Sequence, residues 1–330
     1  MKTYKISDLP GTAGVSAPLA LTLNPLKKQK QRLQLLALGD VGMTVLLGLR
    51  LLGADTIESI GIIDLNEKNV ERLLLEINQI RYPFGDWPES GMPTLPPVYP
   101  VAEDKVFDCD VFVFCASKGV PPLGAKGDVR MAQLEANSAL VAHFAQLAKA
   151  VNYQGLFCEV SDPVDPLAKV FWKNSGVAPT QVQGYGLGVM NARACYYAQR
   201  EPELAHYLTE GRAFGPHGGD LVIADSLTNY NEDKSEKLTK LTVEANLVVR
   251  GLGYKPYIAP AMSSAAISII LTLQGAWHYG SVYLGDETTG AYFGVRNRYT
   301  PDGVEYEDVT VGPELFARLQ KAYTNLCQLV

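Results

Sequence analysis

The chain has 330 residues, of which 47% are hydrophobic and 19% are charged, and its formal net charge is -6 at pH 7. This length and apolar content suffice for one or two domains with a buried core. The mildly acidic balance argues against nucleic-acid partners and against an anionic membrane surface, because both are bound through a basic field.

Residues 1–30 show no clear periodicity and are predicted to form an N-terminal extension that packs on a neighbouring domain or subunit. After them, short apolar runs alternate with helical stretches, including a long helix over 128–151, and a proline-rich surface loop is expected over 92–100. This alternation with short turns is typical of a doubly wound parallel sheet. The expected strands are LQLLAL (33–38), SIGIID (59–64), DVFVFCA (110–116) and LFCEVS (156–161).

After Pro163 the pattern becomes that of an α+β domain. Short strands are expected at QVQGYG and RAFGPHGG, and aromatic and β-branched runs predict longer ones. Thr300-Pro301-Asp302-Gly303 is a strong turn signal between the last two of these runs. The longer strands are expected at 277–285, 291–299 and 304–311, and the helices at 234–252, 261–273 and 314–329.

The first strand runs into the turn ALGDVG, which matches the dinucleotide-binding pattern G-x-G-x-x-G except for Ala37 in the first glycine position. In that pattern one glycine permits the bend, the next lets backbone approach the pyrophosphate, and the third packs the helix on the sheet. Gly39 and Gly42 keep the last two roles, and Ala37 is expected to be tolerated through a negative φ. The turn residues expected at the cofactor are Gly39, Asp40, Val41 and Gly42.

Asp64 ends the second expected strand, close to the spacing at which an acidic residue binds the adenosine ribose. A carboxylate there accepts hydrogen bonds from both ribose hydroxyls and repels a 2′-phosphate, so NAD is favoured over NADP. The alternative is that Asp64 only caps the following helix. Turn, strand and acid together predict a Rossmann-type dinucleotide-binding domain over 31–165, followed by an α+β catalytic domain over 166–330.

Five scattered cysteines form no C-x-x-C pair, so buried free thiols in a reducing cytoplasm are expected. The four histidines lack the spacing of a metal site such as H-E-x-x-H, and no metal is predicted. No run approaches the roughly 18 apolar residues of a membrane span, and the first residues lack the apolar stretch of a secretion signal.

A series of motifs over residues 31–330 resembles, in order, those of the lactate/malate dehydrogenase family. They are GDVG (39–42), IIDLNEKN (62–69), CASKG (115–119), VSDPVD (160–165), GYGLGVMNARA (184–194) and FGPHGGD (214–220). The resemblance implies hydride transfer between NAD and the C2 carbon of a 2-oxo or 2-hydroxy acid, in a homodimer or homotetramer. It also implies that Ala116 and Ser117 border the nicotinamide half of the cofactor.

The same resemblance assigns His217 as the acid/base histidine, Arg193 as the clamp for the substrate carboxylate, and Arg130 as the loop arginine that polarises the carbonyl. Asn137 also matches the family pattern, with a role that is structural at the least. The plainer alternatives are a histidine with no role at a strand end and two arginines that are ordinary surface charges.

The sequence departs from the family at the partner of the histidine. The aspartate expected three positions before Arg193 is Met190, and the adjacent Asn191 would point elsewhere on a helix. Loss of a carboxylate partner removes stabilisation of an imidazolium worth about 1–3 pKa units. The asparagine of the V-S-N-P motif is Asp162 here, near the nicotinamide ribose in the family. Our hypothesis is that Asp162 pairs with His217 instead.

Two further departures bear on the substrate. The substrate loop offers Lys118 and Lys126 but no arginine in the malate-specifying place, and residues 120–123 (VPPL) suit an apolar or bulkier side chain. Glu159 stands inside a buried strand pattern, where an unpaired carboxylate is costly, so a partner is expected.

The sequence therefore predicts an NAD-dependent 2-hydroxyacid dehydrogenase acting on a substrate other than ordinary malate. One alternative is a pseudo-enzyme that retains the dinucleotide site and serves in binding or regulation. The other alternative is an NAD-dependent glycosidase with a metal held by cysteine and histidine, for which the sequence offers no convincing pair.

Overall fold

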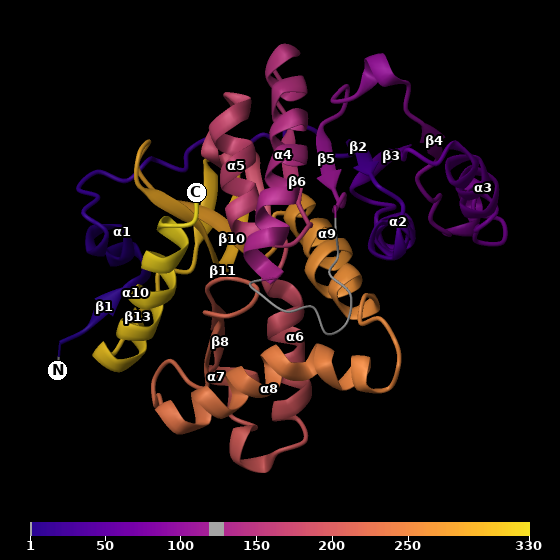
Figure 1. The fold of residues 1–330 in the computed structure, drawn as a ribbon. Coiled ribbons are helices and arrows are strands. Elements are labelled where there is room, and N and C mark those ends of the chain that lie inside the picture. The colour runs from indigo at the N-terminus through magenta and orange to yellow at the C-terminus, as the bar shows by residue number, and fades with distance from the viewer. Residues whose placement is uncertain (1, 119–128) are drawn as a thin grey trace.

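The computed structural model describes residues 2–118 and 129–330, apart from the side chains of residues 129–132. Its centre is a nine-stranded sheet in the order β12-β11-β10-β7-β6-β5-β2-β3-β4, with two small two-stranded sheets beside it (Figure 1). The strands are β1 (Tyr4–Lys5), β2 (Gln31–Leu36), β3 (Ile57–Ile63), β4 (Val98–Pro100), β5 (Val111–Phe114), β6 (Leu156–Glu159), β7 (Val182–Gly184), β8 (Arg212–Phe214), β9 (Val222–Ala224), β10 (His278–Gly285), β11 (Gly290–Thr300), β12 (Gly303–Tyr306) and β13 (Thr310–Val311).

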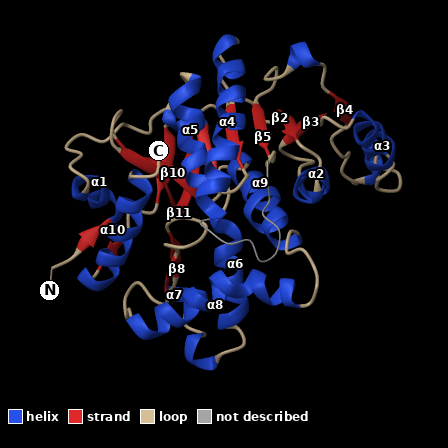
Figure 2. Ribbon diagram, viewed as in Figure 1, coloured by secondary structure: helices blue, strands red, loops and turns tan. Residues whose placement is uncertain are grey.

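Helices connect these strands and cover the sheet (Figure 2). The α-helices are α1 (Leu9–Thr12), α2 (Asp40–Leu52), α3 (Glu67–Asn78), α4 (Val129–Ala150), α5 (Val164–Ser175), α6 (Leu187–Ala198), α7 (Tyr207–Glu210), α8 (Glu232–Gly251), α9 (Ile267–Leu273) and α10 (Pro313–Cys327). The 3-10 turns are η1 (Ile6–Asp8), η2 (Pro88–Ser90), η3 (Glu103–Lys105), η4 (Pro179–Gln181) and η5 (Pro202–Leu204), and η6 (Pro260–Ala266) is a π-helix.

The strands β4-β3-β2-β5-β6-β7 are all parallel, and in chain order they give the sequence 3-2-1-4-5-6 of a doubly wound dinucleotide-binding sheet. The α/β class and the Rossmann-type sheet predicted from the sequence are therefore confirmed. Strands β10, β11 and β12 continue the same sheet in antiparallel pairing. Because β7 lies beyond residue 165 and the sheet continues without a break, the division at 165/166 remains a prediction.

The parallel strands are buried on both faces, so their sequences are nearly continuous apolar runs. On one face Leu33, Leu35 and Val113 pack with α2, α3, η6 and α9. On the other face Phe112 and Phe157 pack with α4 and α5. The helices α2 and α3 thus cover one face of the sheet and α4 and α5 the other, as right-handed crossovers in the two directions from β2 require.

The N-terminal segment packs on the C-terminal half of the chain. β1 pairs with β13, and Ile6 and Leu9 are fully buried against α10 and the β10–β11 hairpin. The backbone N–H of Leu19 donates to Gly285 O, so the segment follows the sheet edge before it enters β2. Its burial makes it an integral part of the fold.

Two local expectations were wrong. The proline-rich stretch 92–100 is not a loop throughout, because Val98–Pro100 forms β4 at the edge of the sheet, where proline is tolerated. Ala37 was expected to keep a negative φ, but its φ is +73°. The turn therefore needs the left-handed conformation that the pattern glycine would supply, and Ala37 adopts it at the cost of strain.

This strain makes a testable prediction. Ala37→Gly is expected to raise the free energy of unfolding by about 1 kcal/mol, because glycine adopts a positive φ without a Cβ clash. The matched control is Ala317→Gly at an exposed position inside α10, which should lose about 1 kcal/mol. Denaturant unfolding measures both variants, and a loss at Ala37 equal to that at Ala317 would contradict the assignment of strain.

Candidate active site

The carboxyl ends of the central strands lie in one row across the sheet. Ile63 pairs with Leu36, Leu36 with Phe114, Phe114 with Glu159, and Glu159 with Gly184. The segments that follow these five residues therefore emerge side by side at the same edge. This edge of a doubly wound sheet is where ligands bind. The sequence-predicted residues 37–42, 64, 116–117 and 162 all follow directly from this row.

The glycine turn is built by close backbone contacts. A Cβ on Gly42 would overlap the carbonyl oxygen of Ala37, so only glycine lets α2 start this close to β2. A Cβ on Gly39 would meet nothing within 4 Å, which leaves open space over the turn. Gly39 is the N-cap of α2 and offers no side-chain hydrogen bond. The first backbone N–H groups of the helix therefore have no partner within the helix. Such a helix start binds anions.

Asp64 follows β3 beside this turn. Its carboxylate accepts the backbone N–H groups of Leu38 at 2.6 Å and Asn66 at 2.8 Å. The N-cap of α3 is Asn66, whose side chain accepts from Asn69 N. The alternative that Asp64 serves only as the helix cap is therefore wrong. Its carboxylate is fixed between the turn and the end of the next strand.

Asn137 holds the ends of β5 and β6 together. It is fully buried in α4, where its Oδ1 accepts the backbone N–H of Lys118 at 2.7 Å. Its Nδ2 donates to Asp162 O at 2.7 Å and to Ser117 Oγ at 3.3 Å. Ser161 Oγ adds a bond to Ala116 O at 2.7 Å. Residues 116–118 and 162 are thus one hydrogen-bonded unit.

His217 lies on the segment between β8 and β9, in contact with this unit. Its Nδ1 is 3.0 Å from Oδ1 of Asp162, and Asp162 has a half-exposed side chain. A Cβ on Gly186 would lie 2.7 Å from Cβ of His217, so the glycine after β7 makes room for the histidine. The two side chains are in the contact that the hypothesis from the sequence requires, and no hydrogen bond joins the other ring nitrogen, Nε2, to any of the described residues.

Arg193 lies on α6 in the same neighbourhood. Burial lowers the pKa of Arg193, whereas the charges of Tyr197 and Asp162 raise it, so Asp162 lies within electrostatic range of the guanidinium. No hydrogen bond joins the guanidinium to another residue in the part of the chain that the structure describes. A half-buried planar cation of this kind suits bidentate binding of a carboxylate.

Met190 and Asn191 explain why the acid is not on this helix. Met190 is buried among Leu187, Val189 and Leu204, so the position is part of an apolar core. Asn191 Oδ1 accepts the hydroxyl of Tyr207 at 2.9 Å and points away from His217. Arg130 lies in the first turn of α4, but its side chain falls outside the described residues, as does the predicted substrate loop with Val120, Leu123 and Lys126.

Two buried acids, Asp165 and Glu159, lie near the site. Sequence reasoning missed Asp165, the last residue of VSDPVD; burial raises the pKa of Asp165 to about 6, against the lowering effects of Ser281 and His217. The partner expected for Glu159 is found for only one of its carboxylate oxygens. Oε1 accepts Ser161 N at 2.8 Å, whereas Oε2 has no partner among the described residues. Burial raises the pKa of Glu159 well above its usual range, against the lowering effect of its hydrogen bonds with Ser161.

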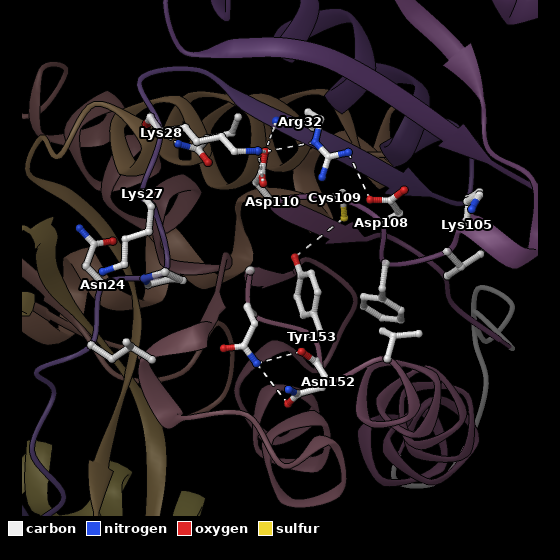
Figure 3. Close-up of a pocket in the computed structure, with 18 of the residues that line it drawn as sticks. Asn24, Lys27, Lys28, Arg32, Lys105, Asp108, Cys109, Asp110, Asn152 and Tyr153 are labelled. Atoms are coloured by element: carbon white, nitrogen blue, oxygen red, sulfur yellow. Dashed lines mark hydrogen bonds and ion pairs between the residues drawn. The ribbon is translucent and has the colours of Figure 1, made fainter.

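A cavity of about 620 Å³ lies at the opposite edge of the sheet, where β2, β5 and β6 begin (Figure 3). Its charged groups bind one another: Asp110 accepts Lys28 Nζ at 2.7 Å and Arg32 N at 2.8 Å, and Arg32 reaches Asp108 at 3.2 Å. Tyr153 donates to Leu156 O at 3.0 Å. The cavity marks the junction between the N-terminal segment and the sheet, away from the row of strand ends.

Comparisons with known proteins give a consistent result, although no family model matches. The L-lactate dehydrogenase of Corynebacterium glutamicum (strain R) is 26% identical over 210 residues, 63% of this chain and 62% of that protein. A lactate dehydrogenase from a Medee basin deep-sea metagenome library has a TM-score of 0.71 at 17% identity, over 92% of this chain and 98% of that one. The malate dehydrogenase of Aeropyrum pernix has a TM-score of 0.72 at 18% identity, over 90% of this chain and 97% of that one.

The chain is therefore similar to lactate dehydrogenases in sequence, at low identity, and to lactate and malate dehydrogenases in fold. The match to the C. glutamicum relative spans about 62% of the length of that protein. Likeness to the solved structures at this identity concerns the fold alone. The family resemblance predicted from the sequence motifs is confirmed.

The cysteines and the helices of the described residues add three observations. All five cysteines are free; Cys109 and Cys158 are buried, but Cys115, Cys195 and Cys327 are only partly so. Within the described residues, no helix has the length and apolar character to cross a bilayer, and no group of three or more His, Cys, Asp or Glu side chains could hold a metal ion.

The burial of Asp165 predicts a pH-dependent stability. The folded state holds the proton of Asp165 more tightly than the unfolded state, so its contribution is complete below pH 3.8 and is lost as pH rises through about 6. This difference corresponds to about 3 kcal/mol. Relative to Asp165→Asn, the wild type should therefore lose about 3 kcal/mol of unfolding free energy between pH 3.5 and 7. Denaturant unfolding at several pH values tests this, and a constant difference would contradict it.

Proposed function

We propose that this chain is an NAD-dependent oxidoreductase that interconverts a 2-oxo acid and a 2-hydroxy acid. The observation that carries the proposal is the His217–Asp162 hydrogen bond at 3.0 Å, at the edge of the sheet where the glycine turn also opens. A proton-transfer group beside a dinucleotide turn is the arrangement that this reaction needs. Similarity to L-lactate dehydrogenases in sequence supports the reaction class.

The residues of the turn fit a dinucleotide. Gly39 leaves open space, Gly42 lets the backbone approach closely, and the start of α2 offers N–H groups to a pyrophosphate. Asp64, which accepts Leu38 N beside the turn, is our candidate for the ribose contact. Its negative charge disfavours a 2′-phosphate, so we infer NAD as the cofactor. When bound, NAD accepts or supplies the hydride. Ala116 and Ser117 would border its nicotinamide half.

The substrate is assigned to the space around Arg193 and His217. Arg193 binds the substrate carboxylate through its planar guanidinium. His217 donates a proton to the carbonyl oxygen during reduction and accepts it during oxidation, using the ring nitrogen that does not face Asp162. Asp162 fixes the tautomer and orientation of the ring and stabilises its cationic form. We keep Arg130 as the second substrate arginine on the resemblance, and an apolar substrate side chain on the sequence of the loop.

The second candidate is a pseudo-enzyme that binds NAD without turnover, favoured by Met190 in the position of the family aspartate. Net attraction for an anionic substrate is also reduced by Asp162, which lies near Arg193. We propose a cytoplasmic homodimer or homotetramer in either case, because both inferences follow the family.

Turnover and binding measurements separate these functions. Purified protein should oxidise NADH with at least one 2-oxo acid from a panel whose members carry small, acidic, branched or aromatic side chains. His217→Asn should lower kcat by roughly 10²- to 10⁴-fold. Asp162→Asn should lower kcat and change the pH–rate profile for reduction, because the ring of His217 loses the carboxylate that it contacts.

The matched control is Asp220→Asn, which removes a charge from the same segment but contacts Asn325 instead of His217. It should leave the profile in place. NADH binding followed by fluorescence, with no turnover on any acid, would favour the pseudo-enzyme. An unmoved profile for Asp162→Asn would contradict its assigned role.

A further inference from the structure

Lys255 lies on the connector between α8 and η6 and is held against the glycine turn. Its Nζ is 2.8 Å from Oδ2 of Asp40, the first residue of α2, although the two are 215 positions apart in sequence. The Lys255 side chain is 81% exposed and that of Asp40 is 44% exposed. The ion pair therefore lies in solvent, where such pairs are weak and can open.

Asp40 is an unfavourable neighbour for a phosphate. The start of α2 favours an anion through its free N–H groups and its dipole, but a carboxylate in the same turn repels one. Lys255 neutralises that carboxylate, and Asp40 raises the pKa of Lys255, so the lysine remains charged. The turn thus presents a negative and a positive group side by side at the place assigned to the pyrophosphate.

The connector that carries Lys255 is anchored on the same helix. Five residues further on begins η6, which packs on α2 so closely that a Cβ on Gly48 would overlap Ala266 and lie 3.0 Å from Sδ of Met262. The N–H of Ala261 donates to Tyr257 O at 3.0 Å and joins the connector to this anchor. The connector is therefore held near α2 independently of the contact between Lys255 and Asp40.

We propose that Lys255 binds the pyrophosphate of the dinucleotide, and that Asp40 holds the lysine in position until the cofactor arrives. The inference rests on the proposed function, because it requires a dinucleotide at the start of α2. The two charges of a pyrophosphate attract the ammonium group more strongly than one carboxylate, so Lys255 turns from Asp40 to the phosphates. Asp40 then weakens binding, and Lys255 strengthens it.

The test is a double-mutant cycle of NADH affinity on the full chain, followed by fluorescence. Lys255→Met is expected to raise the Kd about fivefold to tenfold, and Asp40→Asn to lower it about threefold to tenfold. The decisive step is Lys255→Met in the Asp40→Asn background. A lysine that binds phosphate still gives a loss of about fivefold or more there, whereas one that only neutralises Asp40 gives none, which overturns the proposal.

Lys240→Met on the exposed surface of α8 is the matched control and should leave the Kd unchanged. ADP, which carries a pyrophosphate but no nicotinamide, should show the same fold-changes as NADH, and a loss confined to NADH would overturn the assignment to the phosphates. Absence of NADH binding by the wild type would instead remove the dinucleotide site of the proposed function, and this inference with it.

Discussion

The structure depends on the alignment of its parallel strands at their carboxyl ends. Residues 36, 63, 114, 159 and 184 stand in one row of register partners. Because a slip of one residue would exchange the two faces of a strand, the apolar packing on both faces fixes this row. The positions of the glycine turn, Asp64, the Asn137 unit and His217 all follow from this one constraint.

Within that frame, the place of the acidic partner follows from burial. Position 190 points into an apolar cluster, and a carboxylate there would have to be paired to be tolerated. Asp162 stands at a strand end with a half-exposed side chain, where a charge is far less costly. With the acid at position 162 instead of 190, His217 still contacts one carboxylate, and α6 packs through Met190. The cost falls on the substrate side, because the carboxylate lies within range of Arg193.

The sequence predicts the sheet well because each buried parallel strand is a short apolar run bounded by turn residues. It also predicts the His217–Asp162 contact, because the acid missing at position 190 is matched by an added acid at position 162. It could not predict the φ of Ala37, because that angle is imposed by the approach of Gly42 to the Ala37 carbonyl. Sequence analysis did not identify Asp165 or Lys255 for a different reason. Their surroundings are formed by neighbours more than fifty residues away in the chain.

The helices that carry the turn and the arginine are not independent. The π-helix η6 lies between α2 and α6 and touches each through a glycine, since a Cβ on Gly48 would overlap Ala266 and one on Gly188 would overlap Ser263 O. Ser264 Oγ donates to Gly186 O at 2.7 Å and accepts Val189 N at 2.8 Å, which fixes the start of α6. Side chains at either glycine would force the helices apart. Close backbone packing therefore sets the distance between the glycine turn and Arg193, and the seven residues of the π-helix lie between the two helices that carry them.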